Sequence, residues 1–363
     1  MTTTVNNKSE VVQSGTTISI DAMGGDLGPA AIVAGIVRVA QKNKRIHFLL
    51  HGQEEQLLKL VAKRQSLKGR VTIIDSVEVI KMEDKPSHVV RHGKATSMWS
   101  AIDSVRDGDA SVCVSCGNTG ALMAISMVRL RKLNGVNRPA IAILWPSSNP
   151  MGFNVMLDVG ADVRADPKDL LQYALMGVSY ARNGLGIAKP RVGLLNVGTE
   201  EHKGRSELKE AYSKIEDCQL EANFVFEGFV EGGDIPGSKV DVIVTDGFTG
   251  NVALKTAEGT ASLIGYLLRE AFRFSPLSKL ASILAFTSLN RFKMRIDPRR
   301  VNGGVFLGLN GTVVKSHGSA DATGIEAAIK LAFELSKNDF LQKVAARVAY
   351  AGVMDNDVYD DAN

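Results

Sequence analysis

Asp241–Lys255 reads DVIVTDGFTGNVALK, and this stretch decides the fold. It begins with a short apolar run, Val242–Val244, which is typical of a buried strand, and continues into a loop rich in Gly, Thr and Asn. From Val252 onward the apolar residues follow a helical spacing. The glycines allow the backbone to turn tightly, and the first N–H groups of a helix have no partner inside the helix and attract anions. The stretch therefore predicts a strand–loop–helix unit, which either binds an anion or only turns the chain.

Similar Gly-rich stretches recur along the chain, and none contains a GxxxxGK[ST] or GxGxxG pattern. They are Ile20–Gly28 (IDAMGGDLG), Val112–Leu122 (VCVSCGNTGAL), Val192–Glu200 (VGLLNVGTE) and Val305–Lys315 (VFLGLNGTVVK). Each begins with an apolar strand pattern. Because the carboxyl ends of parallel strands meet at one edge of a sheet, we expect these loops to form a single phosphate-binding cleft.

Strand and helix patterns alternate over most of the chain. This predicts an α/β fold, a doubly wound three-layer α/β/α arrangement around a mostly parallel sheet. We predict strands at Thr17–Ile20, Ile46–Leu50, Val71–Ile74, Ser111–Val114, Ile141–Leu144, Asn154–Leu157, Val192–Val197, Phe224–Phe226, Val240–Val244 and Val305–Leu309. We predict helices at Ala30–Gln41, Glu54–Gln65, Thr96–Arg106, Ala121–Leu133, Lys168–Ala181, Arg205–Ile215 and Val252–Ala271.

Two regions depart from this alternation. Only a Pro/Ser/Asn/Gly connector joins Ile141–Leu144 to Asn154–Leu157, which predicts an antiparallel pair at an edge of the sheet or in a second lobe. The C-terminal run Ala320–Ala351 predicts two helices joined near Lys337–Asp339.

The length and composition are consistent with one large folded unit. The chain has 363 residues, of which 45% are hydrophobic. We predict a disordered extension over residues 1–16, a single α/β catalytic domain over residues 17–352 and an acidic tail over residues 353–363. The extension has no apolar core of the kind found in secretory signals, so we expect none.

The net charge of +4 is unevenly distributed. Residues 269–300 carry eight Lys or Arg against two acidic residues, so the basic charge is local and does not indicate nucleic-acid binding. The three cysteines, Cys113, Cys116 and Cys218, form no zinc-site pattern, and we expect them to be packing residues in a reducing cytoplasm.

Leu267–Ile296 reads LLREAFRFSPLSKLASILAFTSLNRFKMRI and predicts an amphipathic helical hairpin within residues 267–300. Pro276 is expected to end one helix and begin the next. Leu280–Asn290 has no charge but is too short to span a bilayer. With basic residues on both sides, such a hairpin fits an anionic membrane surface, although a dimer interface or an exposed lid is also compatible. The predicted contact residues are Leu280, Ile283, Leu284, Phe286, Arg291, Lys293 and Arg295.

Five motifs in order make the chain resemble the PlsX family of acyl-acyl carrier protein:phosphate acyltransferases, from about Ile18 to about Tyr350. They are Ile20–Pro29 (IDAMGGDLGP), Ser115–Ala121 (SCGNTGA), Leu194–Gly204 (LLNVGTEEHKG), Val242–Lys255 (VIVTDGFTGNVALK) and Leu307–Asp321 (LGLNGTVVKSHGSAD). Cys116 departs from the family pattern, in which a small residue such as Ala is expected, and the N-terminal extension lies outside that pattern.

The resemblance implies transfer of a fatty acyl group from acyl carrier protein to inorganic phosphate. The acyl phosphate would then serve glycerol 3-phosphate acylation in phospholipid synthesis. The resemblance also implies a fold similar to phosphate acetyltransferases, a homodimer, peripheral attachment to the cytoplasmic face of the membrane, and contact with the downstream acyl-phosphate:glycerol-3-phosphate acyltransferase. It implies no cofactor and no required metal.

Three residues are predicted to take part in the reaction. Lys203 would bind phosphate or the oxyanion and assist the departing sulfur; otherwise it is a solvated surface lysine. Asn251, at the expected helix start, would orient phosphate or the carbonyl; otherwise it is only a helix cap. His317 would act as a general acid or base, although a loop histidine bonded to backbone is equally common.

A further set of residues is predicted to bind phosphate or to shape the loops that do. It comprises Asp21, Gly24, Gly25, Asp26, Ser115, Gly117, Asn118, Thr119, Asp246, Gly247, Thr249 and Gly250. Asp21 and Asp26 are expected to position loop backbone rather than to hold a metal.

Other classes of protein are less compatible with the sequence. No GxSxG elbow indicates a serine hydrolase. A nicotinamide-dependent dehydrogenase with a similar two-lobed, isocitrate dehydrogenase-like architecture would need an acidic metal cluster and an adenosine site, and neither is visible. A non-enzymatic scaffold at the membrane surface remains the alternative.

Overall fold

The computed structural model describes residues 15–296, 303–337 and 340–348, with backbone alone over residues 293–296. The predicted tail at residues 353–363, and the predicted extension apart from residues 15 and 16, lie outside this description.

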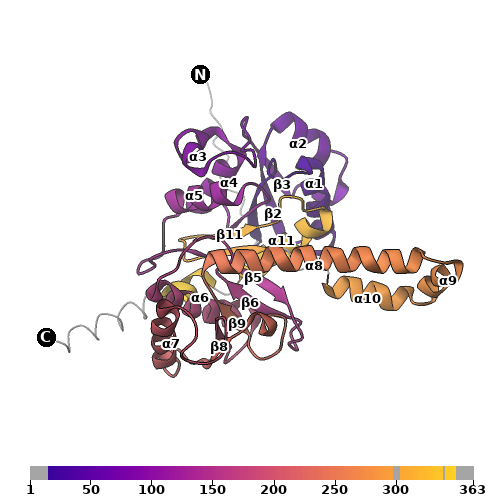
Figure 1. Ribbon diagram of the computed structural model, residues 1–363. Helices are drawn as coiled ribbons and strands as arrows, with labels where there is room; N and C mark the ends of the chain where they lie inside the picture. Colours follow the sequence, from indigo (N-terminus) through magenta and orange to yellow (C-terminus); the bar gives the residue numbers. More distant parts are fainter. Residues whose placement is uncertain (1–14, 297–302, 338–339, 349–363) are drawn as a thin grey trace, which may run out of the picture.

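One eleven-stranded sheet runs through the described chain, in the order β3-β2-β1-β4-β11-β10-β5-β6-β9-β7-β8 (Figure 1). The strands are β1 (Thr16–Asp21), β2 (Ile46–Gly52), β3 (Val71–Asp75), β4 (Val112–Ser115), β5 (Ala140–Pro146), β6 (Phe153–Leu157), β7 (Arg191–Leu195), β8 (Val225–Val230), β9 (Val242–Val244), β10 (Gly304–Leu307) and β11 (Thr312–Lys315).

The sheet reverses its direction near the centre. β3, β2, β1, β4 and β11 form one parallel set, and β6, β9, β7 and β8 form another. Between them, β10 is antiparallel to both β11 and β5, and β5 is antiparallel to β6. The predicted antiparallel pairing of Ile141–Leu144 with Asn154–Leu157 is confirmed. A place at an edge of the sheet is wrong, because the pair lies in the middle.

The stretch Val305–Lys315 forms a β-hairpin, whereas its likeness to the other Gly-rich stretches suggested a strand followed by a helix. β10 turns through Gly308, whose φ of 88° suits glycine, and the chain returns as β11. The expectation failed because β11 has only four residues, Thr312–Lys315, and reads as part of the loop.

Helices cover both faces of the sheet and complete the three predicted layers (Figure 1). Alternate strand residues enter two separate cores, as the pleat requires. Val112 and Val114 belong to one core cluster, and Cys113 and Ile141 belong to the other. The helices are α1 (Gly28–Lys42), α2 (Glu54–Val61), α3 (Pro86–His92), α4 (Ser97–Arg106), α5 (Thr119–Arg129), α6 (Pro167–Leu185), α7 (Ser206–Cys218), α8 (Gly247–Arg273), α9 (Pro276–Leu284), α10 (Phe286–Ile296) and α11 (Ala322–Leu335), with 3-10 turns at Gln65–Leu67, Gly93–Ala95 and Gly232–Asp234.

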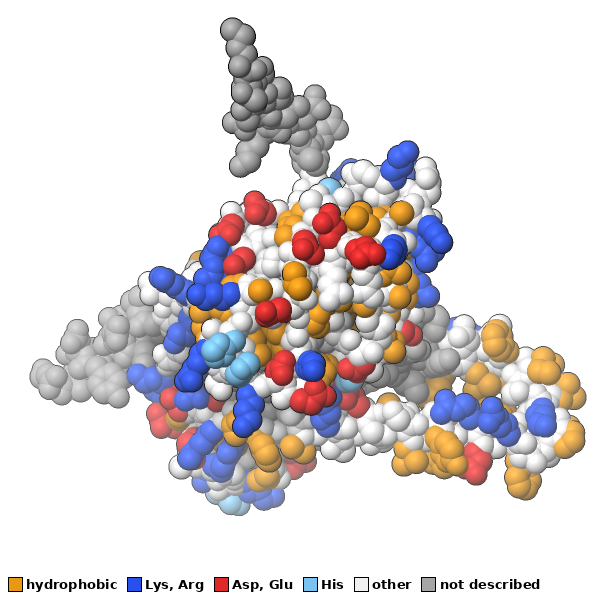
Figure 2. All heavy atoms as spheres, turned by 90° about the horizontal axis from the view of Figure 1, so that it is seen from above, with side chains coloured by type: hydrophobic (Ala, Val, Ile, Leu, Met, Phe, Trp, Pro, Cys, Tyr) orange, Lys and Arg blue, Asp and Glu red, His pale blue; other side chains and the backbone are white. Residues whose placement is uncertain are grey.

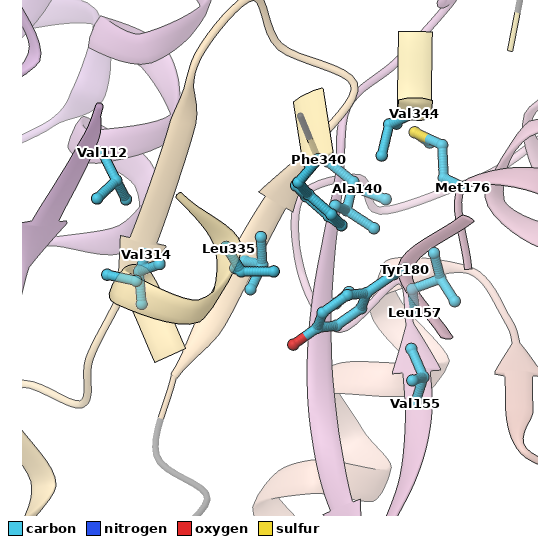
Figure 3. Packing of buried hydrophobic residues seen from close by; sticks show 14 of the residues in the cluster. Val112, Ala140, Val155, Leu157, Met176, Tyr180, Val314, Leu335, Phe340 and Val344 are labelled. Carbon is cyan, nitrogen blue, oxygen red and sulfur yellow. The ribbon is translucent and has the colours of Figure 1, made fainter. Parts of the chain in front are cut away.

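The larger core ties the last described helical segment to the centre of the sheet (Figure 3). Tyr180 of α6 is fully buried, and its ring meets that of Phe340 edge-on at 5.8 Å between ring centres. Phe340 begins a second helical segment, residues 340–348, after α11 ends at Leu335. The two predicted C-terminal helices are therefore present, and burial of each such large side chain stabilises the fold by about 1.5–3 kcal/mol.

A long helical arm projects from the body (Figure 1). α8 has 27 residues, or about 40 Å of helix, and only its first part crosses the sheet. α9 begins at Pro276, as predicted, and α10 runs back along α8. Figure 2 shows hydrophobic side chains at the tip, where Leu284 is 80% exposed. None of the helices in the described chain combines the length and apolar character that a membrane span needs.

Candidate active site

The Gly-rich loops gather in two groups at opposite edges of the sheet. The first loop cluster contains the loops after β1, β4 and β11 (residues 22–27, 116–118 and 316–321), and the second contains those after β6, β7 and β9 (residues 158–166, 196–205 and 245–246). The two sets of strands run in opposite directions, so their carboxyl ends lie at opposite edges. The expectation that all these loops lie at one edge of the sheet is therefore wrong.

Asp21, the last residue of β1, is the centre of the first loop cluster. Its carboxylate accepts hydrogen bonds from the hydroxyls of Ser97 and Ser115, each at 2.7 Å, and from the backbone N–H groups of Met23 and Gly24. Burial raises the pKa of Asp21, and the two hydroxyl donors oppose that rise. The side chain therefore holds the loop after β1 in place.

Gly24 and Gly25 allow the three loops to meet backbone to backbone. A Cβ on Gly24 would lie 2.8 Å from the backbone nitrogen of Gly117, and one on Gly25 would lie 3.0 Å from the carbonyl oxygen of Gly318. Asp26 adds a hydrogen bond from its N–H to the same Gly318 oxygen at 2.8 Å. These glycines therefore serve the close approach of the loops to one another.

Asn118 and Thr119 begin α5 but differ in what they face. Asn118 caps the helix by accepting from the Ala121 N–H at 3.0 Å, and its amide donates to the carbonyls of Met82 and Asp84. Thr119 is exposed and lines the cavity described below. Of this pair, only the Thr119 side chain is directed toward a ligand space.

Lys315 and Ser316, at the end of β11, lie between the first loop cluster and α8. The Lys315 ammonium donates to the Ser316 carbonyl and lies 3.5 Å from the Cys116 carbonyl. Burial lowers the pKa of Lys315 to about 8. Neither residue was predicted, because the short strand β11 was not recognised; the signal was a lysine at a strand end, two residues before the predicted His317.

His317 is held by its own loop. Its Nδ1 accepts from the Ser319 N–H at 3.2 Å and lies 2.8 Å from the Ser319 hydroxyl, so we assign the ring proton to Nε2. Nε2 lies 4.0 Å from a carboxylate oxygen of Glu258 on α8. Burial lowers the pKa of His317, with Glu258 opposing the shift and Lys255 and Lys315 reinforcing it. The ring is therefore a neutral donor near pH 7.

Two glycines at the start of α8 pack against the second loop cluster. A Cβ on Gly247 would lie 1.9 Å from the Asp162 carbonyl, and one on Gly250 would lie 1.9 Å from the Asp158 carbonyl. The Asp158 carboxylate is buried and accepts from four backbone N–H groups. They belong to Ile141, Gly160, Ala161 and Asp162. Gly247 and Gly250 therefore have a packing role, which the phosphate prediction did not include.

α8 begins at Gly247, five residues before the predicted start. Asp246 caps it by accepting from the Thr249 N–H at 2.8 Å and is also paired with Arg205. Burial alone would raise the pKa of Asp246, but these two bonds hold it below its usual value. Asn251 accordingly lies one turn inside the helix, where it faces Gly160.

Lys203 lies in the exposed loop after β7. Its ammonium is 2.8 Å from Glu200, and this hydrogen bond raises the Lys203 pKa. Lys203 does not line the cavity described next, among the residues that the structure describes.

A cavity of about 470 Å³ lies between β5 and α8 and connects the two loop clusters. Ile141, Ile143 and Trp145 form one wall, and α8 contributes Leu254, Ala257 and Ala261. The alanines are too small to fill the space above the sheet, which leaves the gap open. Asn251 and Gly160 lie at one end, and Thr119, Lys315, Ser316 and His317 at the other. From Asn251 to Ala261 the helix rises about 15 Å, so the cavity is long and mostly apolar.

The predicted site residues therefore fall into three groups. Of those predicted to react or to bind phosphate, Thr119, Asn251 and His317 line the cavity, and the others lie in or beside the two loop clusters. The predicted contact residues of the arm lie apart from the cavity, in α9 and α10. The sequence reading missed Lys255 and Glu258 of α8, although both lie one or two turns beyond Asn251 on the cavity side.

The cysteines take no part in this arrangement. Cys113, Cys116 and Cys218 are all free and buried. Burial raises the pKa of Cys116 to about 11, so it remains a thiol at neutral pH. Within the described ranges, no group of three or more His, Cys, Asp or Glu side chains is placed to hold a metal ion.

Solved structures share this architecture. A phosphotransacetylase from Streptococcus pyogenes aligns with a TM-score of 0.57 at 18% identity, covering 89% of this chain and 94% of that one. The EutD phosphotransacetylase from Staphylococcus aureus gives 0.52 at 14% identity, covering 92% and 94%. At these identities the likeness shows the fold alone, and it places the chain in the three-layer α/β fold class.

Within that class the family is clear. Residues 16–343 match the family described as "Fatty acid synthesis protein", and the chain belongs to it, which confirms the resemblance to the PlsX family. A phosphate acyltransferase from Ruegeria sp. (strain TM1040) is 70% identical over 336 residues, covering 93% of this chain and 90% of the relative. One from Dinoroseobacter shibae (strain DSM 16493 / NCIMB 14021 / DFL 12) is 69% identical over 339 residues, covering 93% and 88%. The protein is therefore an acyltransferase of fatty acid and lipid synthesis.

Proposed function

We propose that this enzyme transfers a fatty acyl group from the thioester of acyl carrier protein to inorganic phosphate, giving acyl phosphate for glycerol 3-phosphate acylation. The observation that carries the proposal is the long apolar cavity under α8, which ends at a polar, cationic group of side chains. An alkyl chain fits the apolar walls and phosphate fits the cationic end. The names of the close relatives support phosphate as the acceptor.

The chemistry asks little of the protein beyond placement. A phosphate oxygen attacks the thioester carbonyl carbon, and the tetrahedral intermediate collapses as the carbon–sulfur bond breaks and the carrier thiolate departs. Phosphate is already anionic, so the main contributions are proximity and stabilisation of the oxyanion. We assign His317 the role of donating its Nε2 proton to the oxyanion or to the departing sulfur.

We also propose, from the family resemblance, that Lys203 and Asn251 take part in the reaction. Asn251 lines the cavity, so its amide can orient a bound group there. Lys203 stands outside the cavity and is paired with Glu200. A direct role for Lys203 therefore requires the loop after β7 to move.

The arm and the body are proposed to meet different partners. The exposed apolar tip, with Ile283 and Leu284 at 70% and 80% exposure, suits an anionic membrane on the cytoplasmic face, near the downstream acyltransferase. Leu284→Glu is expected to abolish flotation with anionic liposomes, and unchanged flotation would contradict the membrane contact.

The basic residues Arg291, Lys293 and Arg295 suit either this surface or the acidic carrier protein. If Lys293 and Arg295 bind the carrier protein, replacing both with Glu would raise KM for the acyl carrier substrate. An unchanged KM would favour contact of these residues with the membrane.

We also propose that two copies associate through α8. Of its 27 residues only Gly247 and Gly250 are buried in this chain. Phe248, Val252 and Leu263 are more than half exposed and share one face, opposite the face over the cavity. Val252→Glu is therefore expected to shift the mass measured by sedimentation from dimer to monomer, and a wild-type monomer would refute the pairing.

The decisive experiment is detection of acyl phosphate by mass spectrometry. Purified protein is mixed with palmitoyl-acyl carrier protein and phosphate, with and without a chelator. Phosphate-dependent acyl phosphate that survives chelation supports the proposal. Free fatty acid would mean that water is the acceptor, and no reaction would favour a scaffold that binds the membrane without catalysis.

A further inference from the structure

We propose that Lys315 and Ser316 form the binding site for the acceptor phosphate, so that transfer takes place at this end of the cavity and the acyl tail extends beneath α8 toward Gly160. This inference rests on the proposed function, because it assigns the place of one substrate of that reaction.

The first observation concerns the direct contacts of the Lys315 ammonium. Among the described residues, no carboxylate lies within 4.0 Å of its ammonium, which instead contacts the carbonyl oxygens of Cys116 and Ser316. A lysine in this position retains donor capacity, since its ammonium has three N–H groups. Lys315 also lines the cavity, so an anion can reach it.

The second observation is the Ser316 hydroxyl. Ser316 is completely buried, and its hydroxyl has no hydrogen-bond partner in the described chain apart from an approach to the Cys116 thiol. Buried hydroxyls are normally satisfied, and an orphaned one costs stability. A phosphate oxygen bound beside Lys315 would accept this hydrogen bond.

The surroundings favour an anion at this place. The N-terminus of the eleven-residue helix α5 reaches the cavity at Thr119, and its partial positive charge adds to that of Lys315. His317 lines the same end of the cavity, as does Lys255, whose ammonium is paired with Glu258 at 2.9 Å. The charged or titratable groups that act on Lys315 are Cys116, Lys255, Asp21 and Asp26.

The direction of the acyl chain follows from the walls. Between Lys315 and Gly160 the cavity passes Ile143 and Ile141 on the sheet and Ala257 and Leu254 on α8. With phosphate at Lys315, the thioester carbonyl lies near His317, and these apolar walls give the tail a path toward Gly160.

The test measures phosphate binding by calorimetry in the absence of acyl substrate, and KM for phosphate in the acyl phosphate assay. Lys315→Met is expected to weaken both by at least about tenfold, Ser316→Ala to weaken them less, and Lys315→Arg to restore most of the affinity. Lys59→Met serves as the control, because Lys59 is an exposed lysine of α2 paired with Glu55. The phosphate affinity of Lys59→Met should match that of the wild type.

A pH series separates binding from a structural role. Because the Lys315 pKa is about 8, its charge is present below that pH and is lost above it. Affinity for phosphate should therefore fall by about tenfold per pH unit above about pH 8 in the wild type. The fall should be absent in Lys315→Met and moved to higher pH in Lys315→Arg.

The outcomes are distinct. Unchanged phosphate affinity in Lys315→Met, with a folded protein by circular dichroism, overturns the inference even if acyl phosphate is formed. If the wild type forms no acyl phosphate, the proposed function fails, but the binding data still decide whether Lys315 and Ser316 bind phosphate.

Discussion

The two ends of the cavity under α8 are built alike but carry their charges differently. Both ends are lined by loops that follow strands, and both depend on glycines for close backbone approach. In the second loop cluster the basic groups are already neutralised: Lys203 pairs with Glu200 at 2.8 Å, and Arg205 pairs with Asp246. In the first, the Lys315 ammonium contacts the carbonyl oxygens of Cys116 and Ser316, and within the described chain no carboxylate pairs with it. A Gly-rich loop therefore says little about where an anion binds, whereas a buried cation with no carboxylate in contact says a great deal.

The largest effect is expected from Asp21→Ala. Removing the carboxylate leaves two hydroxyls and two N–H groups without their acceptor, which should lower the free energy of unfolding by roughly 3 kcal/mol. Asp246→Ala is the matched change in the second loop cluster. It removes a helix cap and a pairing with the exposed Arg205, and should cost about 1–2 kcal/mol. Urea denaturation of both variants measures the difference, and equal losses would contradict the central role of Asp21.

His317→Ala should lower kcat by about a hundredfold with little change in KM for phosphate, because the variant loses a proton donor and keeps Lys315. Asn251→Ala is the comparison from the other end of the cavity. A larger loss of kcat in Asn251→Ala than in His317→Ala would place the reacting carbonyl beside α8's first turns instead.

Leu254→Trp tests the direction of the acyl chain. The added ring would fill the cavity near Asn251, so turnover of palmitoyl substrate should fall by about tenfold while that of an octanoyl substrate should change little. Ala261→Phe, at the end of the cavity near the first loop cluster, should instead lower turnover of both substrates. The reverse pattern would mean that the tail points toward His317.

Lys203→Ala should have the smallest effect, less than about threefold on KM for phosphate, because the ammonium is exposed and paired with Glu200. Steady-state kinetics beside Lys315→Met provide the measurement. A greater loss than in Lys315→Met would move phosphate to the second loop cluster and support the role that the family resemblance implies for Lys203.

Much of the fold could be predicted from local patterns. Apolar strand runs, the break at Pro276 and the antiparallel pairing of β5 with β6 are all written in adjacent residues. The reversal of the sheet is different, because it depends on β10 lying between β5 and β11, a pairing between segments more than 150 residues apart. Because the sequence does not reveal this pairing, all the Gly-rich loops were expected at one edge of the sheet.

The site was harder to predict for the same reason. Asp21 and His317 were identified because they stand in loops of recognisable composition. Lys315 and Ser316 were not identified, because only the folded structure shows their surroundings. In the described chain, Lys315 has no carboxylate partner and the Ser316 hydroxyl has no hydrogen-bond acceptor. The start of α8 was misplaced because Asp246–Gly247 reads as a turn, although Asp246 is a helix cap.

The continuity of α8 gives the molecule a lever. The same helix roofs the cavity near its first turns and forms the arm further along, and no proline interrupts its 27 residues. For a tilt about Gly247, Glu258 lies about 16 Å from the pivot and Arg273 about 39 Å, so a 5 Å swing at the outer end displaces the roof by roughly 2 Å. Anything that grips the tip of the arm therefore also limits how far the roof can open.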